Sequence, residues 1–235
     1  MEKRTHITGL SGNMLKIIAI AAMVVDHCAA VLLSGVLPNV WILRMIGRIT
    51  APIMCFFIAE GYYHTSNLKK YMGRLLLAAV ISHIPYNLCF GHDIFSLNTD
   101  VMFSLLLGLA ALAICKSDRL AVWQKVLGAA ACCVLSYHAD WGYIAVLWIL
   151  GFGLFYGSRL KQTAAFAAVS MLYILQPFMQ GMVPANISRL GVFLAIPLLM
   201  LYSGERGKKS KFIKWAFYWF YPIHLMIIYF ISKFI

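Results

Sequence analysis

Residues 14–35 read MLKIIAIAAMVVDHCAAVLLSG, and this stretch decides the fold. It is long enough to cross the hydrocarbon core of a bilayer, which takes about 20 predominantly apolar residues. It is too long for the apolar region of a cleavable signal peptide, and it lacks a small-residue cleavage site. We therefore expect residues 14–35 to stay in the chain as its first membrane span.

The composition of the whole chain points the same way. Of its 235 residues, 62% are apolar and 12% are charged, and the mean hydropathy is +0.81. Soluble domains are about half apolar and about a quarter charged. A water-soluble fold of this composition would lack the polar residues to cover its surface. The composition predicts an integral membrane protein of the all-α class.

Further apolar runs follow along the chain, separated by short stretches rich in Gly, Pro, Asn or charge. They predict a bundle of about nine transmembrane helices, at residues 14–35, 40–62, 68–90, 100–116, 121–137, 140–157, 161–177, 187–203 and 212–233. No repeat is visible, and no connection is long enough for a second domain. We expect residues 1–235 to form a single transmembrane domain.

The distribution of Lys and Arg predicts the orientation, because cytoplasmic loops carry an excess of these residues. In a nine-span arrangement most of them fall on one side, and only Arg189 and Lys233 fall on the other. The first side then holds Lys3, Arg4, Lys16, Lys69, Lys70, Arg74, Lys116, Arg119, Lys125, Arg159, Lys161, Arg206, Lys208, Lys209, Lys211 and Lys214. This bias predicts a multi-pass protein of the inner, or cytoplasmic, membrane with a cytoplasmic N-terminus.

The formal net charge of +12 raises the possibility of a nucleic-acid partner. The bases lie in short clusters between apolar runs and form no stripe with interleaved aromatic residues. Membrane orientation explains them better, so we predict the lipid bilayer as a partner and no nucleic acid. The six cysteines form no CxxC pair, and we predict no metal site.

Some ionisable residues lie well inside the first two predicted spans, where charges cost about 2.5 to 3.5 kcal/mol each and usually mark function. Asp26 and His27 are in the first span, and Arg44 and Arg48 share one face of the second. Pairing the spans as a hairpin places Asp26 and His27 within about one turn of Arg48 in depth. We expect an ion pair between Asp26 and Arg48.

The same count of depth brings His83 and His224 to the level of His27. The simplest interpretation is that each histidine bonds the backbone of a neighbouring helix. Four predicted helices that contribute polar groups at one depth instead favour a shared site. Other polar residues, Asn98, Asp100, His138 and Asp140, are placed in outer loops, where solvated polarity explains them equally well.

A second polar layer is predicted on the cytoplasmic side, where Lys16, Glu60, His64, Lys69, Lys70 and Arg74 lie. Basic residues at this level are often only snorkelling toward lipid headgroups. Alternatively, Lys70 and Arg74 share one helix face and suit the phosphates of a cosubstrate. Lys16 and His27 are also on one face, roughly 16 Å apart, so a long thin cosubstrate could bridge the two layers.

Four segments carry a resemblance to a known family: LSGNMLKIIAIAAMVVDH (10–27), GRITAPIMCFFIAEGYYHT (47–65), RLLLAAVISHIPYN (74–87) and FYWFYPIHLMIIY (217–229). They resemble the TraX family, whose namesake acetylates the N-terminus of a conjugative pilin. The chain is more distantly similar to the membrane acyltransferase 3 group, in which a base precedes a histidine on the first helix, as Lys16 precedes His27 here. That group generally has arginine in place of Lys16 and Ser-Gly in place of Glu60-Gly61.

The resemblance implies an acyl-CoA-dependent membrane acyltransferase. Acetyl-CoA or another acyl-CoA is the expected cosubstrate, and the acceptor is an amine or hydroxyl on a pilin-like peptide, a glycan or a lipid. His27 would be the general base, and Arg48 or His83 would stabilise the oxyanion. Asp26 would hold the charge or the tautomer of its partners. The remaining residues divide into a cosubstrate set, Lys16, Lys70, Arg74, Glu60 and His64, and an acceptor set, Arg44, Asn87, His224 and Tyr221.

Two other functions use similar residues. Intramembrane Asp, His and Arg also build the proton relays of transporters. The chain lacks the repeated halves with paired broken helices that many transporters have. A non-catalytic assembly factor of a secretion or conjugation system is the second alternative, although such a factor would not need Asp26, His27 and Arg48 at one depth.

Overall fold

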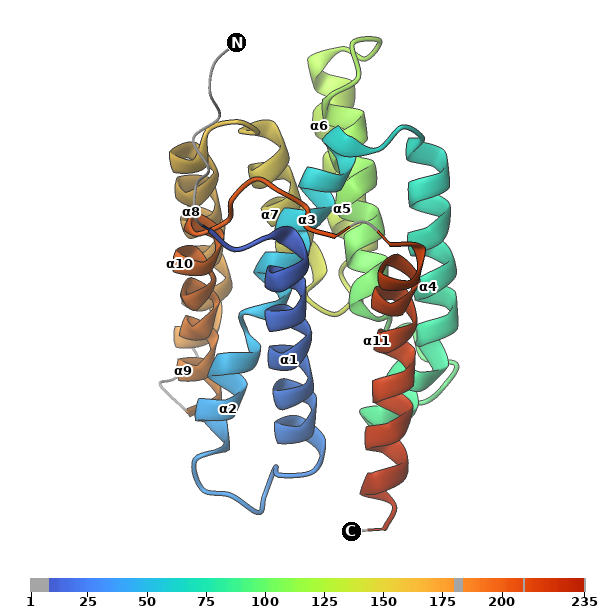
Figure 1. Ribbon diagram of the computed structural model, residues 1–235, viewed down its shortest axis with the longest axis vertical. Helices are drawn as coiled ribbons and strands as arrows, with labels where there is room; N and C mark the ends of the chain where they lie inside the picture. Colours follow the sequence, from blue (N-terminus) through green and yellow to red (C-terminus); the bar gives the residue numbers. More distant parts are fainter. Residues whose placement is uncertain (1–8, 180–183, 209, 235) are drawn as a thin grey trace.

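The computed structural model describes residues 9–179, 184–208 and 210–234, and these residues form helices and their connections (Figure 1). No β-strand occurs in this part of the chain. Two isolated bridges pair Leu10 with Tyr202 and Thr99 with Ala139. The prediction of an all-α fold is confirmed.

The helices lie close to the predicted apolar runs. Their bounds are α1 Gly12–Val31, α2 Val40–Gly47, α3 Thr50–His64, α4 Leu68–Cys89, α5 Val101–Cys115, α6 Val122–Leu135, α7 Gly142–Leu154, α8 Arg159–Phe178, α9 Pro184–Ile187, the 3₁₀ helix η1 Ser188–Leu194, α10 Ala195–Met200 and α11 Lys211–Ser232. Two of the predicted continuous helices are broken, because residues 40–62 form α2 and α3, and residues 187–203 form α9, η1 and α10.

Three helical segments among the described residues are long and apolar enough to cross a membrane. They are Gly12–Val31, Val40–His64, which counts α2 and α3 together, and Trp215–Ser232. Four shorter apolar segments are Val101–Cys115, Val122–Leu135, Gly142–Leu154 and Ser188–Met200. The described chain thus has the apolar helices that are typical of a membrane protein, and its candidate spans include α1 and α11.

Pro52 explains the break between α2 and α3. Proline has no backbone N–H, and its ring clashes with the carbonyl four residues earlier, which here belongs to Arg48. The regular hydrogen-bond pattern is interrupted at that residue, and α3 begins at Thr50. The break matters for the site because Arg48 stands at it, whereas Arg44 lies inside α2.

α7 lies at the centre of the bundle, between α3, α5, α6 and α8. Most of its residues are buried, and Trp148 on α7 is fully enclosed. Glycine allows the closest approaches: a Cβ atom on Gly108 of α5 or Gly153 of α7 would collide with the facing Ile149 or Leu112. This packing leaves α1, α4 and α11 on one side of α7, around the site described below.

The loop at 201–208 closes over the beginning of α1 (Figure 1). The backbone N–H of Gly12 donates to the Glu205 carbonyl at 2.8 Å, and the N–H of Asn13 donates to the Arg206 carbonyl at 3.0 Å. The first N–H groups of a helix have no partner within the helix, so these carbonyls satisfy groups that would otherwise be unpaired. The beginning of the first long helix is thus held by a segment almost 200 residues later.

Candidate functional site

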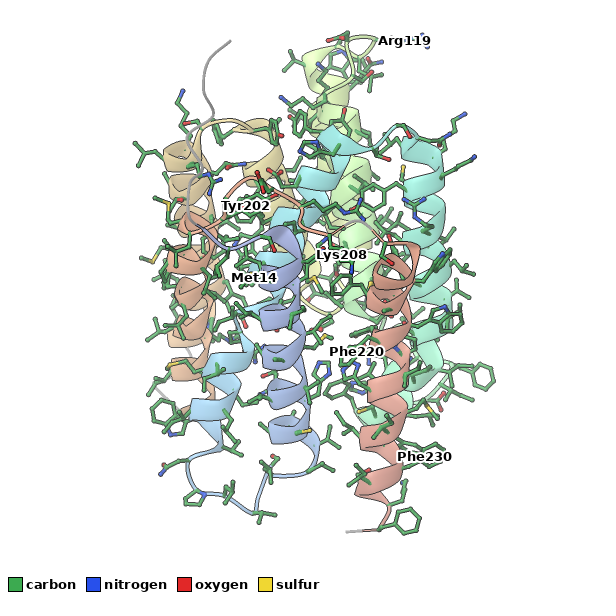
Figure 2. The ribbon with its side chains drawn as sticks, in the orientation of Figure 1. Met14, Arg119, Tyr202, Lys208, Phe220 and Phe230 are labelled. Carbon is green, nitrogen blue, oxygen red and sulfur yellow. The ribbon has the colours of Figure 1, made fainter. Side chains whose placement is uncertain are left out.

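A cavity of about 1170 Å³ lies among α1, α2, α3, α4 and α11 and runs along α1. One end, which we call the basic rim, is lined by Lys16, Lys70, Arg74 and Arg206. The other end, which we call the deep site, is lined by Asp26, His27, Arg44, Arg48 and Asp140. Figure 2 labels Lys208 near the beginning of α1 and Phe220 on α11. The structure therefore joins the two predicted polar layers in one space.

Asp26 forms an ion pair with Arg44 in the deep site. The Nη1 atom of Arg44 lies 3.1 Å from Oδ2 of Asp26 and also donates to the Asp26 backbone carbonyl at 3.2 Å. α2 can approach this closely because Gly47 faces Asp26, and a Cβ atom on Gly47 would overlap the Asp26 side chain. The other carboxylate oxygen, Oδ1, is buried against Gly47 and has no hydrogen-bond partner.

The prediction that Asp26 pairs with Arg48 is therefore wrong. Among the described residues Arg48 forms no ion pair within 4 Å, and its buried Nε atom has no hydrogen-bond partner. Its guanidinium lies 5.2 Å from the centre of the Trp141 ring. Arg48 sits at the break before α3, whereas Arg44 is inside regular helix α2. Equal depth and a shared helix face did not decide which arginine reaches the carboxylate.

Asp140 is a cavity residue that the sequence placed in a solvated outer loop. Its N–H donates to the Thr99 carbonyl at 2.8 Å, and its own carbonyl accepts from Ser104 Oγ at 2.5 Å. The next residue, Trp141, has φ 64°, a left-handed conformation that is uncommon for a bulky residue and clusters at functional sites. Asp140 and Arg48 thus face the same end of the cavity.

The depth of Asp140 follows from helix length. α6 has 14 residues and α7 has 13, so each extends only about 20 Å. Figure 1 shows the turn that joins them near mid-height, above the lower ends of α1 and α11. The sequence treated both runs as full spans and so put this turn at the membrane surface. If the runs at 121–137 and 140–157 had been interpreted as shorter helices, the turn between them, and Asp140 with it, would have been placed deeper.

His27 and His224 form a hydrogen-bonded pair between the first and last long helices. Nδ1 of His27 lies 2.8 Å from Nε2 of His224, and both side chains are buried. Nδ1 of His224 lies 2.9 Å from the Phe220 carbonyl. His27 lines the cavity, whereas His224 lies outside the described lining and contacts the cavity through His27. The predicted common depth of these histidines is matched by direct contact, but His224 is not placed to touch an acceptor.

Tyr221 does line the deep site, as its assignment to the acceptor set requires. Its ring centre is 6.4 Å from that of His27, and its buried hydroxyl has no hydrogen-bond partner. Phe90 also packs edge-on against His27, with ring centres 5.4 Å apart. Aromatic rings thus surround the imidazole and limit the access of water to it.

His83 and Asn87 do not reach the cavity. His83 Nε2 bonds the Ile94 carbonyl at 3.1 Å, and Asn87 Nδ2 donates to the Asn98 carbonyl at 3.2 Å. Both residues anchor the loop after α4 and are absent from the described lining of the cavity. The reason is helical periodicity, since residues 83 and 87 share one face of α4 while residues 86 and 90 share the face toward His27. The structure gives no support for His83 as an oxyanion group.

At the basic rim, the side chains of Lys16, Glu60 and His64 have the following partners. Lys16 Nζ lies 4.7 Å from the centre of the Phe57 ring, and no ion pair joins Lys16 to Glu60 in the described chain. Glu60 instead pairs with His64 at 3.5 Å, one turn later on α3. Lys70 and Arg74 line the cavity together, as predicted from their spacing. Arg206, from the loop over α1, joins them.

We expect a double-mutant cycle to separate Arg44 from Arg48 as the partner of Asp26. Asp26→Asn and Arg44→Gln each remove one side of a buried pair, so their effects on the free energy of unfolding should couple by about 0.5 to 3 kcal/mol. Chemical unfolding in mixed micelles measures this. The matched control is the cycle of Asp26→Asn with Arg48→Gln, for which we expect a smaller coupling. A larger coupling to Arg48 would contradict the assigned pair.

Comparison with known proteins places the chain in a family. The family described as TraX protein matches residues 11–232. The chain is 34% identical over 231 residues to a probable fimbrial assembly protein (FimC, serogroup H1) of Dichelobacter nodosus, covering 93% of this chain and 94% of that protein. It is 24% identical over 237 residues to an uncharacterized protein of Rickettsia prowazekii (strain Madrid E), covering 93% and 91%. No solved structure matches significantly. The chain therefore belongs to the TraX family.

Proposed function

We propose that the protein is a membrane acyltransferase that moves an acyl group from an acyl-CoA, such as acetyl-CoA, to an amine or hydroxyl acceptor. Family membership and the similarity to a probable fimbrial assembly protein suggest a role in pilus assembly or pilin modification. A pilin-like peptide, a glycan and a lipid are the candidate acceptors. The observation that carries the proposal is one cavity that joins a cluster of cations to a buried histidine.

The dimensions of the cavity support a long, thin cosubstrate. Lys16 and His27 are both on α1 and both line the cavity, eleven residues and roughly 16 Å apart. The volume of about 1170 Å³ exceeds the roughly 300 to 1,000 Å³ of common ligand sites. CoA phosphates at the basic rim would remain hydrated, while the thioester on its flexible arm extends to the deep site.

The chemistry follows from the groups at the deep site. His27 removes a proton from the acceptor N–H or O–H, and the nitrogen or oxygen attacks the thioester carbonyl carbon. The tetrahedral intermediate carries an oxyanion, which Arg48 stabilises with its unpaired N–H. The carbon–sulfur bond then breaks, and His27 returns the proton to the thiolate. The products are the acylated acceptor and free CoA.

The ionic groups around His27 have separate tasks in this scheme. Arg44 is held by Asp26, so its charge is largely compensated. Arg48 lacks an ion-pair partner among the described residues and packs on Trp141, which leaves it able to turn toward the substrate. Asp26 and Asp140 supply negative charge at the same end of the cavity. Arg48 therefore takes the oxyanion role alone, because His83 faces another loop.

We also propose that the helical segments cross the membrane about nine times, with the N-terminus in the cytoplasm. The excess of Lys and Arg on one side supports this, as does the location of the basic rim near the beginning of α1. The rim then opens to the compartment that contains acyl-CoA. The expected location is the inner membrane of the cell.

Cysteine labelling of spheroplasts tests this orientation. We expect Phe95→Cys, at an exposed position after α4, to react with a membrane-impermeant maleimide from outside. Arg119→Cys, at the exposed turn labelled in Figure 2, should react only after the membrane is opened. The unsubstituted protein gives the background from its native cysteines. Labelling of Arg119→Cys in sealed spheroplasts would contradict the proposed orientation.

Turnover by the purified protein tests the proposed reaction. We expect free thiol to appear when the protein in nanodiscs receives acetyl-CoA and an acceptor peptide, glycan or lipid fraction. Because a general base contributes about 10²- to 10⁴-fold, His27→Gln should lower kcat by at least about a hundredfold. Equal turnover by His27→Gln and wild type would remove His27 from the mechanism. If neither turns over any donor while His27→Gln still supports piliation, the non-catalytic assembly role is favoured instead.

The neighbouring lysines Lys69 and Lys70 give a matched test of the basic rim. Lys70 lines the cavity, whereas Lys69 is equally exposed and lies outside the described lining, because successive helix residues point about 100° apart. We expect Lys70→Ala to raise KM for acyl-CoA roughly fivefold through the loss of a phosphate contact, with Lys69→Ala within about twofold of wild type. Equal effects of the two substitutions would argue against phosphates at this position.

A further inference from the structure

The hydrogen bonds of His224 determine where its protons are. The Phe220 carbonyl can only accept a hydrogen bond, so Nδ1 of His224, at 2.9 Å, must carry a proton. In a neutral imidazole the other nitrogen then has the lone pair. Nε2 of His224 is therefore an acceptor, and the group that donates to it is Nδ1 of His27, at 2.8 Å.

The tautomer of His224 also determines the tautomer of His27. With its proton on Nδ1, a neutral His27 has its lone pair on Nε2. Among the described residues Nε2 of His27 has no hydrogen-bond partner, and His27 lines the cavity. The nitrogen that is free to accept a proton is thus the one left to face the substrate.

The orientation of the rings supports a strong bond between them. The two ring planes differ by 9°, and their centres are 5.0 Å apart. With the nitrogens 2.8 Å apart, this separation fits two rings joined edge to edge in nearly one plane, where the lone pair of Nε2 points along the bond. The Phe220 ring stacks on His224, with centres 5.0 Å apart, and holds the outer imidazole in place.

The surroundings favour the neutral form of both rings at rest. Both histidines are buried among aromatic side chains, and burying a charge without a partner is costly. The carboxylate nearest in sequence, Asp26, is already paired with Arg44. A positive charge on His224 would have no counter-charge of its own, and a neutral pair of histidines avoids the cost of burying such a charge.

We propose that His224 is a positioning residue, which fixes His27 in the tautomer with a basic Nε2 and shares the positive charge that develops on His27 during acyl transfer. The inference rests on the proposed function and deepens it. When Nε2 of His27 takes the acceptor proton, His27 becomes an imidazolium that still donates from Nδ1 to His224. The charge then spreads toward the Phe220 carbonyl, and the proton on Nε2 leaves with the thiolate, which restores the resting pair.

A simpler role for His224 would be to join α11 to α1 without effect on proton chemistry. Two substitutions separate these roles. His224→Gln keeps an acceptor oxygen close to the position of Nε2, whereas His224→Leu fills the space with no acceptor. The control is His138→Leu, because His138 is exposed and lies outside the described lining of the cavity.

Two measurements on the protein in nanodiscs test the inference. Nitrogen chemical shifts of ¹⁵N-histidine-labelled protein, with His27 assigned by its loss in His27→Gln, report which nitrogen carries the proton. We expect Nδ1–H in wild type and His224→Gln, and a mixture or Nε2–H in His224→Leu. We also expect His224→Leu to lower kcat on the order of a hundredfold, with KM for acyl-CoA within about twofold, and His224→Gln to recover most of kcat.

The outcomes distinguish this inference from the proposed function. A wild-type protein with Nε2–H on His27 would overturn the assigned tautomer, whatever its turnover. Equal kcat in His224→Leu, His224→Gln and His138→Leu would overturn the positioning role while acyl transfer stands. The expected tautomer in a wild-type protein that transfers no acyl group would instead overturn the proposed function.

Discussion

The site depends on the compensation of a buried carboxylate. Asp26 lies inside α1, and Arg44 on the adjacent α2 supplies the opposite charge at 3.1 Å. Gly47 permits the approach, because any side chain there would occupy the space of Asp26. The pair thereby fixes the position of α2 against α1. Arg48, at the break that follows α2, has no ion-pair partner among the described residues and lines the cavity. One neutralised pair and one available cation result from the same local packing.

Much of the fold could be predicted because hydropathy reports the environment of whole segments. The apolar runs located the helices, and counting residues from the ends brought His27 and His224 to one level, where they are in contact. Helix faces were harder to assign. His83 has the right depth but points to the loop after α4, while Tyr86 and Phe90 on the same helix line the cavity. A count of residues gives the height along a helix, and the rotation of that helix depends on packing that the sequence does not display.

Other errors came from local backbone effects. Pro52 interrupts the second predicted helix, so Arg44 and Arg48 lie in different surroundings despite their spacing. The short α6 and α7 bring Asp140 inward, although a turn between two full spans would lie at the membrane surface. Arg206 reaches the rim because the loop at 201–208 folds back over α1. Such long-range contacts leave no periodic pattern, whereas the neighbouring Lys70 and Arg74 could be identified from their helical spacing.

The closure of α1 by the loop at 201–208 has a consequence for biogenesis. α1 leaves the ribosome well before the loop at 201–208, whose Glu205 and Arg206 carbonyls accept hydrogen bonds from its first turn. The other half of the histidine pair, on α11, emerges later still. A nascent chain can insert its early helices, yet the cap of α1 and the histidine pair form only after residues 201–224 have been synthesised. A chain that stops before residue 201 therefore lacks both the carbonyls that cap α1 and the histidine that pairs with His27.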